Sequence, residues 1–239
     1  MAKLEFLNTE LHKSLRVSTK YKKGLGYDVG AVMVLPCEFL EVQRDLPILF
    51  RKHSDTGRMF PNALLGFEPN ENLLLSDDGE WQGHYTPLAF AKGPFVISPE
   101  TNPETNETKP IISVDLDDPR ISDSDAEPIF EENGELSASM DKMRDNLIVM
   151  HEGIGDIQHM TDALMEAELI EPLKLEITLK NGKEINFEGA YTIAEDKLRA
   201  LDGEKAANLN KTGYLAAAYY IAGSINNIRN LINLKNNQI

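Results

Sequence analysis

Hydrophobic positions follow different periods in the two parts of the 239-residue chain. Up to about residue 135, short apolar runs such as residues 29–35 and 48–50 are separated by Pro, Gly and Asp turns. This pattern predicts an antiparallel, meandering sheet. From Leu136, apolar residues recur at the spacing of a buried helix face. We therefore predict an α+β protein with a β-rich part over residues 1–135 and a helical part over residues 136–239, sharing one core.

The helical part contains one interruption and one start signal. Gly153 and Gly155 fall inside the helical pattern, and a glycine there costs about 1 kcal/mol relative to alanine, so we predict two helices with a break between them. Thr192 and Glu195 have the spacing of a capping box, which predicts that a short helix begins there. The apolar pattern predicts a last helix over residues 212–234.

A β-hairpin interrupts the helical part at residues 173–189. A two-residue turn at Asn181 and Gly182 would put the two apolar sets on opposite faces of the hairpin. A three-residue turn, with Gly182 in the left-handed conformation, brings both sets to one face. The bulged turn is therefore our prediction. The expected pairs are Ile177 with Ile185 and Leu175 with Phe187.

Two stretches of the first part contrast in composition. Residues 71–98 contain the single tryptophan, and a turn is expected at Asp77, Asp78 and Gly79, after which the chain returns from Trp81. Residues 99–110 are poor in apolar side chains and repeat Pro, Glu, Thr and Asn, so we predict a disordered exposed loop.

Charge narrows the classes of partner. The formal net charge is -15 and the sequence pI is near 4.8. That charge opposes the electrostatic attraction on which nucleic-acid binding depends, so nucleic acid is not expected as a partner. The acidic run at residues 115–135 lacks the ligand spacing of a calcium-binding loop, and a solvated acidic loop is predicted instead.

Cofactor and membrane signals are absent from the sequence. No apolar window approaches the length of a membrane span or of a secretory signal, so we predict a soluble, cytoplasmic protein. The single cysteine, Cys37, lies in an apolar run and is predicted to be a buried thiol. His151 and His159 are too far apart for a helical metal-binding pair, and no glycine-rich phosphate-binding motif occurs. We predict neither a metal nor a cofactor.

Two kinds of chemistry compete around Glu38 and the tryptophan. Asp78 and His84 could do acid–base work near Glu38, which would suit a small-molecule or peptide-modifying enzyme. Trp81 and Tyr85 could instead line a site for a peptide, glycan or protein partner, because aromatic side chains combine a large contact area with a polar tip. We favour non-catalytic binding. The candidate ligand-binding residues are Glu38, Asn72, Asp78, Trp81, His84 and Tyr85.

Short motifs along nearly the whole chain carry a family resemblance. They are Glu38-Phe39, Ala63-Leu64-Leu65-Gly66, Asn72-Leu73, Gly79-Glu80-Trp81, Tyr85-Thr86-Pro87 and Gly93-Pro94-Phe95, with Leu169-Ile170-Glu171-Pro172 and Gly189-Ala190-Tyr191 in the second part. In this order, the motifs resemble those of the SapC family. By the name and gene neighbourhoods of that family, the resemblance implies a bacterial surface or nutrient-uptake system, and it supplies no catalytic residues.

Overall fold

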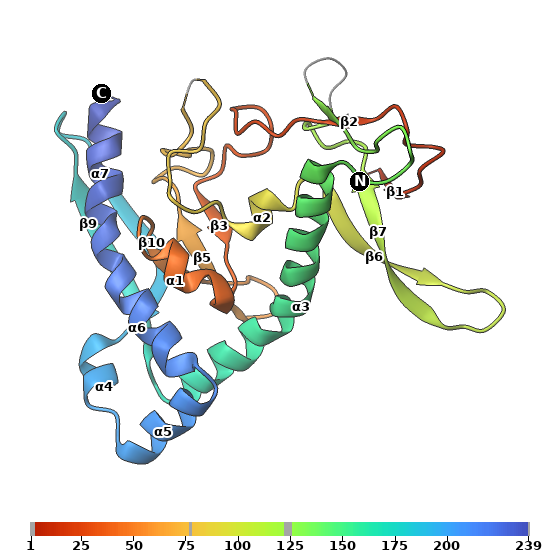
Figure 1. Cartoon of the computed structure of the whole chain (residues 1–239). Helices are drawn as coiled ribbons and strands as arrows, with labels where there is room; N and C mark the ends of the chain where they lie inside the picture. The colour runs from red at the N-terminus through yellow and green to blue at the C-terminus, as the bar shows by residue number, and fades with distance from the viewer. Residues whose placement is uncertain (1–2, 77, 122–125, 239) are drawn as a thin grey trace. The chain divides into compact units, whose positions relative to one another are not determined.

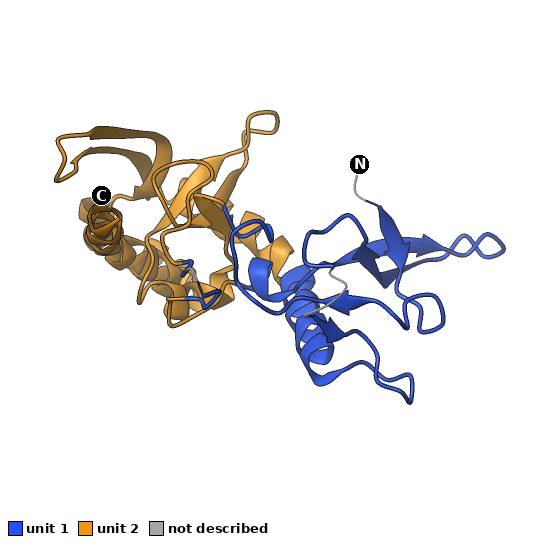
Figure 2. Ribbon diagram, turned by 90° about the horizontal axis from the view of Figure 1, so that it is seen from above, with its two compact units in different colours: residues 1–28, 75–81, 88–152 blue, residues 29–74, 82–87, 153–239 orange. Residues whose placement is uncertain are grey.

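The chain divides into two units that interleave along the sequence (Figure 2). The structure is a computed structural model that describes residues 3–76, 78–121 and 126–238. Unit 1 comprises residues 1–28, 75–81 and 88–152, and unit 2 comprises residues 29–74, 82–87 and 153–239. These boundaries differ from a division at residue 135, and the expectation of one shared core stays a prediction. The predicted α+β class with antiparallel sheets is confirmed.

Unit 1 is built on a three-stranded antiparallel sheet in the order β1-β7-β6, in which β6 and β7 form a long hairpin (Figure 1). Its core is apolar and includes the fully buried Val17, Val114 and Met140. The elements of unit 1 are β1 (Leu4–Phe6), β2 (Arg16–Val17), α2 (Leu88–Ala91), β6 (Phe95–Thr101), β7 (Thr108–Asp115), β8 (Glu127–Pro128) and the first half of α3 (Ala138–Glu166).

The tip of the β6–β7 hairpin corrects the predicted disordered loop. Strand pairing continues outward to Thr101 and Thr108, whose hydroxyl oxygens lie 3.0 Å apart. Beyond them, the Asn102 N–H donates to the Glu107 carbonyl oxygen at 2.9 Å. The prediction was wrong because a strand ladder is held by backbone hydrogen bonds, which a polar stretch can form without burying side chains.

Unit 2 contains a five-stranded antiparallel sheet in the order β3-β5-β4-β10-β9. The elements of unit 2 are β3 (Ala31–Met33), η1 (Pro36–Glu38), α1 (Phe39–Val42), β4 (Ile48–Lys52), β5 (Met59–Leu64), the second half of α3, β9 (Ile170–Thr178), β10 (Glu184–Ile193), α4 (Glu195–Arg199), α5 (Gly203–Lys211), α6 (Tyr214–Ser224), η2 (Ile225–Asn227) and α7 (Ile228–Asn237). None of the helices in the described part of the chain is long and apolar enough to cross a membrane.

Helix α6 packs against strands β4 and β10 of this sheet. It turns its small and apolar side chains inward, so that Ala218 and Ile221 are fully buried. At the end of the helix, the Ser224 hydroxyl accepts a hydrogen bond from the Ile48 N–H at 2.8 Å, which ties α6 to β4. The predicted last helix over residues 212–234 is divided into α6 and α7 by the 3-10 turn η2.

The β9–β10 hairpin has the predicted register. Ile177 pairs with Ile185 and Leu175 pairs with Phe187. Gly182 takes the left-handed conformation at φ 82°, and the Leu179 N–H donates to the Lys183 carbonyl oxygen at 2.9 Å across the turn. The bulged turn that keeps both apolar sets on one face is therefore confirmed.

Helix α3 does not break at its glycines, contrary to the prediction. It runs without interruption from Ala138 to Glu166 (Figure 1). A Cβ atom at Gly153 would lie 2.8 Å from the Leu35 Cδ1 atom, whereas a Cβ atom at Gly155 would meet nothing within 4 Å. Gly153 thus gives Leu35 room to pack against the helix, which is a tertiary requirement that helix propensity does not report.

The predicted capping box at Thr192 is also wrong. Helix α4 begins at Glu195 after Ala194, and no side chain caps its first turn. Thr192 belongs instead to the end of strand β10, where its backbone is extended and its hydroxyl group is buried without a hydrogen-bond partner among the described residues. The strand continues four residues farther than the predicted end at Gly189, to Ile193, which removes Thr192 from the capping position.

Candidate functional site

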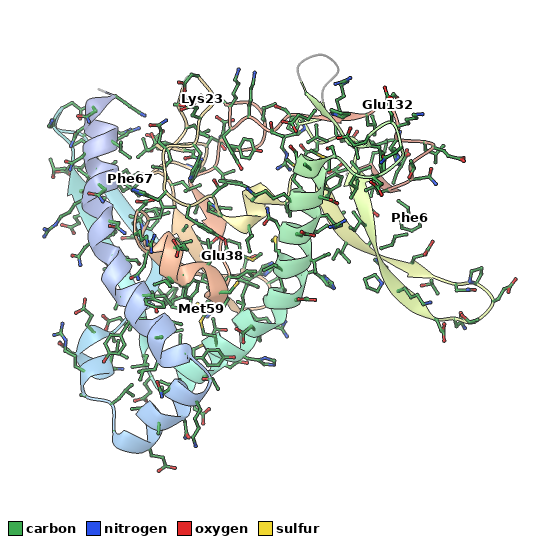
Figure 3. All side chains as sticks on the ribbon, in the orientation of Figure 1. Phe6, Lys23, Glu38, Met59, Phe67 and Glu132 are labelled. Carbon is green, nitrogen blue, oxygen red and sulfur yellow. The ribbon has the colours of Figure 1, made fainter. Side chains whose placement is uncertain are left out.

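A hydrogen bond joins two of the candidate residues, Glu38 and Tyr85. Glu38 is 3% exposed and lies at the start of α1 (Figure 3). Its Oε1 atom accepts a hydrogen bond from the Tyr85 hydroxyl at 3.1 Å, and its Oε2 atom accepts one from the Leu35 N–H at 2.7 Å. Burial and the nearby Glu38 carboxylate both raise the pKa of Tyr85, so the hydroxyl stays protonated and donates a hydrogen bond to Glu38.

The local sequence explains why Glu38 turns inward. Pro36 follows Leu35 and starts the 3-10 turn η1, which is possible because proline lacks the N–H that the first turn would leave unpaired. The Glu38 side chain then reaches back to the N–H of Leu35, as the acidic residue does in a capping box. Glu38 thus supports the entry into α1 while its carboxylate is withdrawn from solvent.

Cys37 corrects a prediction from the same apolar run. The thiol is free and exposed, not buried. Because the chain turns into η1 at Pro36, the core receives Leu35 and Phe39, which are 1% and 0% exposed, while Cys37 lies between them on the outer side of the turn.

His84 lies on the surface of unit 2. Its side chain is 78% exposed, and its Nδ1 atom lies 2.6 Å from Oδ1 of Asp45. The backbone N–H of His84 donates to Oδ2 of the same carboxylate at 2.6 Å. Asp45, which was not among the predicted residues, therefore fixes the position of His84 through two contacts. No local pattern joins Asp45 to His84, which lies 39 residues farther along the chain.

The side chains of Asn72 and Asp78 both accept hydrogen bonds within the turns to which they belong. The Asn72 Oδ1 atom accepts a hydrogen bond from the Leu74 N–H at 3.0 Å, and Asn72 is 7% exposed. Asp78 is exposed and accepts a hydrogen bond from the Ser76 hydroxyl, which lowers the pKa of Asp78. Gly79 adopts φ 88°, as the predicted turn requires, and Asp77 lies outside the described residues. Both polar side chains thus stabilise their own loops.

Trp81 belongs to an aromatic cluster in unit 1. Its ring is half-buried, and its centroid lies 6.0 Å from that of Tyr21 and 5.9 Å from that of Phe90. Tyr27 is buried against Phe90 at 5.2 Å with nearly perpendicular rings. A backbone bridge between Leu75 and Trp81 closes the predicted turn, but residues 82–87 do not continue as a strand. The cluster supports the turn and presents part of the indole ring to solvent.

A buried ion pair lies beside this cluster and was not predicted. Arg120 is 9% exposed, and its guanidinium donates to both carboxylate oxygens of Asp118 at 2.8 and 2.6 Å. Desolvation opposes ionisation of Asp118, but the hydrogen bonds from Arg120 outweigh it, so the pKa of Asp118 is lowered. Residues 122–125 of the acidic run lie outside the described residues.

The candidate residues thus separate into groups. Glu38, Asn72, His84 and Tyr85 belong to unit 2, whereas Asp78 and Trp81 belong to unit 1. The hydrogen bond from Tyr85 to Glu38 joins two of the six directly. Within the described part of the chain, no three His, Cys, Asp or Glu side chains gather in a way that could hold a metal ion.

Comparison with known proteins adds one finding. A family model described as SapC matches residues 7–231, which is nearly the whole chain. No curated protein and no solved structure matches it.

Proposed function

The chain belongs to the SapC family, and from that premise we propose that it is a non-catalytic binding or accessory protein of a bacterial surface or nutrient-uptake system, acting in the cytoplasm. It recognises a peptide, glycan or protein partner. The single cysteine is in keeping with a reducing compartment, because no intramolecular disulfide contributes to the fold.

The observation that supports a non-catalytic role is the burial of Glu38. A general acid or base must come within hydrogen-bond distance of the group that it protonates or deprotonates. Glu38 is 3% exposed, and each of its carboxylate oxygens already accepts a hydrogen bond from its own unit. The alternative enzyme function would require Glu38 to become accessible to a substrate, and loss of either hydrogen bond in that rearrangement would cost about 1.5–3 kcal/mol.

His84 is the candidate in unit 2 that is positioned for a partner. Its imidazole is exposed and its orientation is fixed by Asp45, so that binding would not have to order a flexible side chain. An exposed imidazole that is held in one orientation suits recognition of a partner.

Affinity capture from the native host tests this function. The tagged full-length chain is incubated with host lysate, and bound proteins, peptides and glycans are identified by mass spectrometry. We expect one partner to be enriched, and the His84→Ala variant to bind it about fivefold more weakly, since a single hydrogen bond contributes about 1 kcal/mol. His53→Ala is the matched control, because His53 is also an exposed histidine of unit 2 and should leave capture unchanged. Capture of nothing by the wild-type chain would contradict the proposal.

A further inference from the structure

Unit 2 also contains a cavity that involves none of the six candidate residues. Its volume is about 400 Å³, which is within the range of small-molecule sites. Four adjacent strands supply its floor through Ala31 of β3, Asn62 of β5, Arg51 of β4 and Phe187 of β10. Residues 66–69 supply one wall, which includes Phe67 (Figure 3) and Glu68.

The wall is held in place by its backbone. The Gly30 N–H donates to the Pro69 carbonyl oxygen at 2.8 Å, and the Phe67 N–H donates to Oε2 of Glu71 at 2.9 Å. A Cβ atom at Gly30 would lie 2.3 Å from the carbonyl oxygen of Glu68, so only glycine permits this approach. The cavity is therefore formed before any ligand arrives, and binding would not have to order the wall.

Arg51 brings an uncompensated positive charge to the cavity. Its guanidinium carbon lies 5.5 Å above the centre of the buried Phe187 ring, which orients the planar group. Among the described residues, no carboxylate oxygen lies within 4.0 Å of this guanidinium. In a chain with 39 acidic residues, a guanidinium that lines a cavity without a carboxylate partner is positioned for an anion from outside.

The acidic residue in the wall is already neutralised by its neighbours. Oε1 of Glu68 accepts a hydrogen bond from Lys183 at 2.8 Å, and Lys235 lies 3.8 Å from the same atom. The hydrogen bond from Lys183 lowers the pKa of Glu68, so its carboxylate stays ionised and paired. A monoanion is favoured over a doubly charged phosphate, because Arg51 is the one cationic side chain among the described residues that line this cavity and balances a single charge.

We propose that this cavity binds a carboxylate group carried on an apolar or aromatic body, either a free organic acid or the C-terminus of a peptide. The planar guanidinium of Arg51 donates two parallel hydrogen bonds to the carboxylate. The Asn62 amide donates one N–H to the Phe60 carbonyl oxygen at 2.9 Å, and its other N–H donates to the ligand. The body of the ligand packs on Val29, Ala31, Phe67 and Phe187. This inference rests on the proposed binding function, for which it names the ligand chemistry.

Two-dimensional ¹H–¹⁵N NMR on the full chain tests the site. The probes are 3-phenylpropanoate and its neutral analogue 3-phenylpropanamide, and acetyl-Gly-Phe with a free or an amidated C-terminus. We expect the carboxylates to shift the backbone signals of Gly30 and Gly66, and to bind about tenfold more tightly than the matched amides. Tighter binding of the free acid than of the dipeptide indicates an organic acid as the source, and the reverse order indicates a peptide C-terminus.

Substitutions in strand β4 distinguish a specific effect of the Arg51 guanidinium on carboxylate binding from the effect of removing any positive charge. Arg51→Gln should weaken carboxylate binding about tenfold and leave amide binding unchanged, while Arg51→Lys should fall between, because an ammonium lacks the planar fork. Lys52→Gln removes the same charge from the next, exposed residue of β4 and should bind as the wild type does. Signals distant from the cavity report whether each variant is folded.

Equal affinity for acid and amide in the wild-type chain overturns the inference, as does unchanged binding by a folded Arg51→Gln variant. The acid–amide comparison needs no variant, so it decides the question even where Arg51→Gln fails to fold. Partner capture without carboxylate binding removes this site and leaves the proposed function standing. Carboxylate binding without partner capture would support this site and contradict the proposed function.

Discussion

Each unit holds an arginine whose guanidinium carbon lies 5.5 Å from the centroid of an aromatic ring. In unit 1, Arg120 covers Tyr27, is 9% exposed and donates two side-chain hydrogen bonds to Asp118. In unit 2, Arg51 covers Phe187, is exposed and has no carboxylate partner among the described residues. The distance between the guanidinium and the ring is therefore the same in both units. The difference is that, among the described residues, Arg120 is paired with a carboxylate and Arg51 is not.

The difference separates a structural arginine from one that can bind a ligand. A guanidinium taken out of water must be paired, because an uncompensated buried charge is strongly unfavourable. Arg120 meets that requirement through Asp118 in its own unit, so its charge is already balanced and does not attract a ligand anion. Arg51 keeps contact with water, so it needs no internal partner and can exchange water for a ligand carboxylate.

Asp118→Asn should have the largest effect on stability. Removal of the carboxylate leaves Arg120 buried without its counter-charge, so the free energy of unfolding of unit 1 should fall by roughly 3 kcal/mol. Urea unfolding followed by Trp81 fluorescence measures this, because the single tryptophan of the chain belongs to unit 1. Asp117→Asn is the matched control, since the neighbouring Asp117 is exposed, and should change stability by less than about 0.5 kcal/mol. Equal stability of the two variants would show that the ion pair contributes nothing.

The same ion pair should make unit 1 sensitive to acid. The pKa of Asp118 is lowered in the folded state, so its contribution to stability is complete above the pKa of the unfolded chain, about 3.9, and is lost as pH falls through the folded value. The stability difference between wild type and Asp118→Asn should therefore be full at about pH 6 and should shrink below about pH 4. Trp81 fluorescence across a pH series measures the difference. A stability difference that increased as the pH fell would contradict the prediction that the ionised Asp118 carboxylate stabilises unit 1.

The two arginines also show how far the sequence can be interpreted. The β9–β10 register was predictable because Ile177, Ile185 and Gly182 are close in sequence and their alternation admits one arrangement. Arg51 was not predictable as a site residue, because its neighbours in the cavity come from β5, β10 and the loop after β5. Gly153 was misread for the same reason, since the side chain that requires a glycine there is the distant Leu35.

The candidate site, too, could be predicted only as far as local sequence patterns allow. Residue type and motif density were enough to select Glu38 and Trp81, and the structure gives both of them well-defined surroundings. Their assignment to different units depends on long-range contacts that no local pattern contains. The hydrogen bond from Tyr85 that occupies Glu38 depends in the same way on a residue far along the chain.

Arg51→Gln should have the smallest effect on stability. The loss of its contact with Phe187 should cost less than about 1 kcal/mol, the range for an exposed cation–π pair, because no buried charge is left unpaired. Hydrogen exchange of the β10 amides measures the stability of this sheet without relying on Trp81, and Lys52→Gln supplies the matched control on the same strand. A loss as large as that of Asp118→Asn would assign Arg51 to the fold. Near-wild-type exchange together with lost carboxylate binding would make Arg51 a residue whose charge serves a ligand.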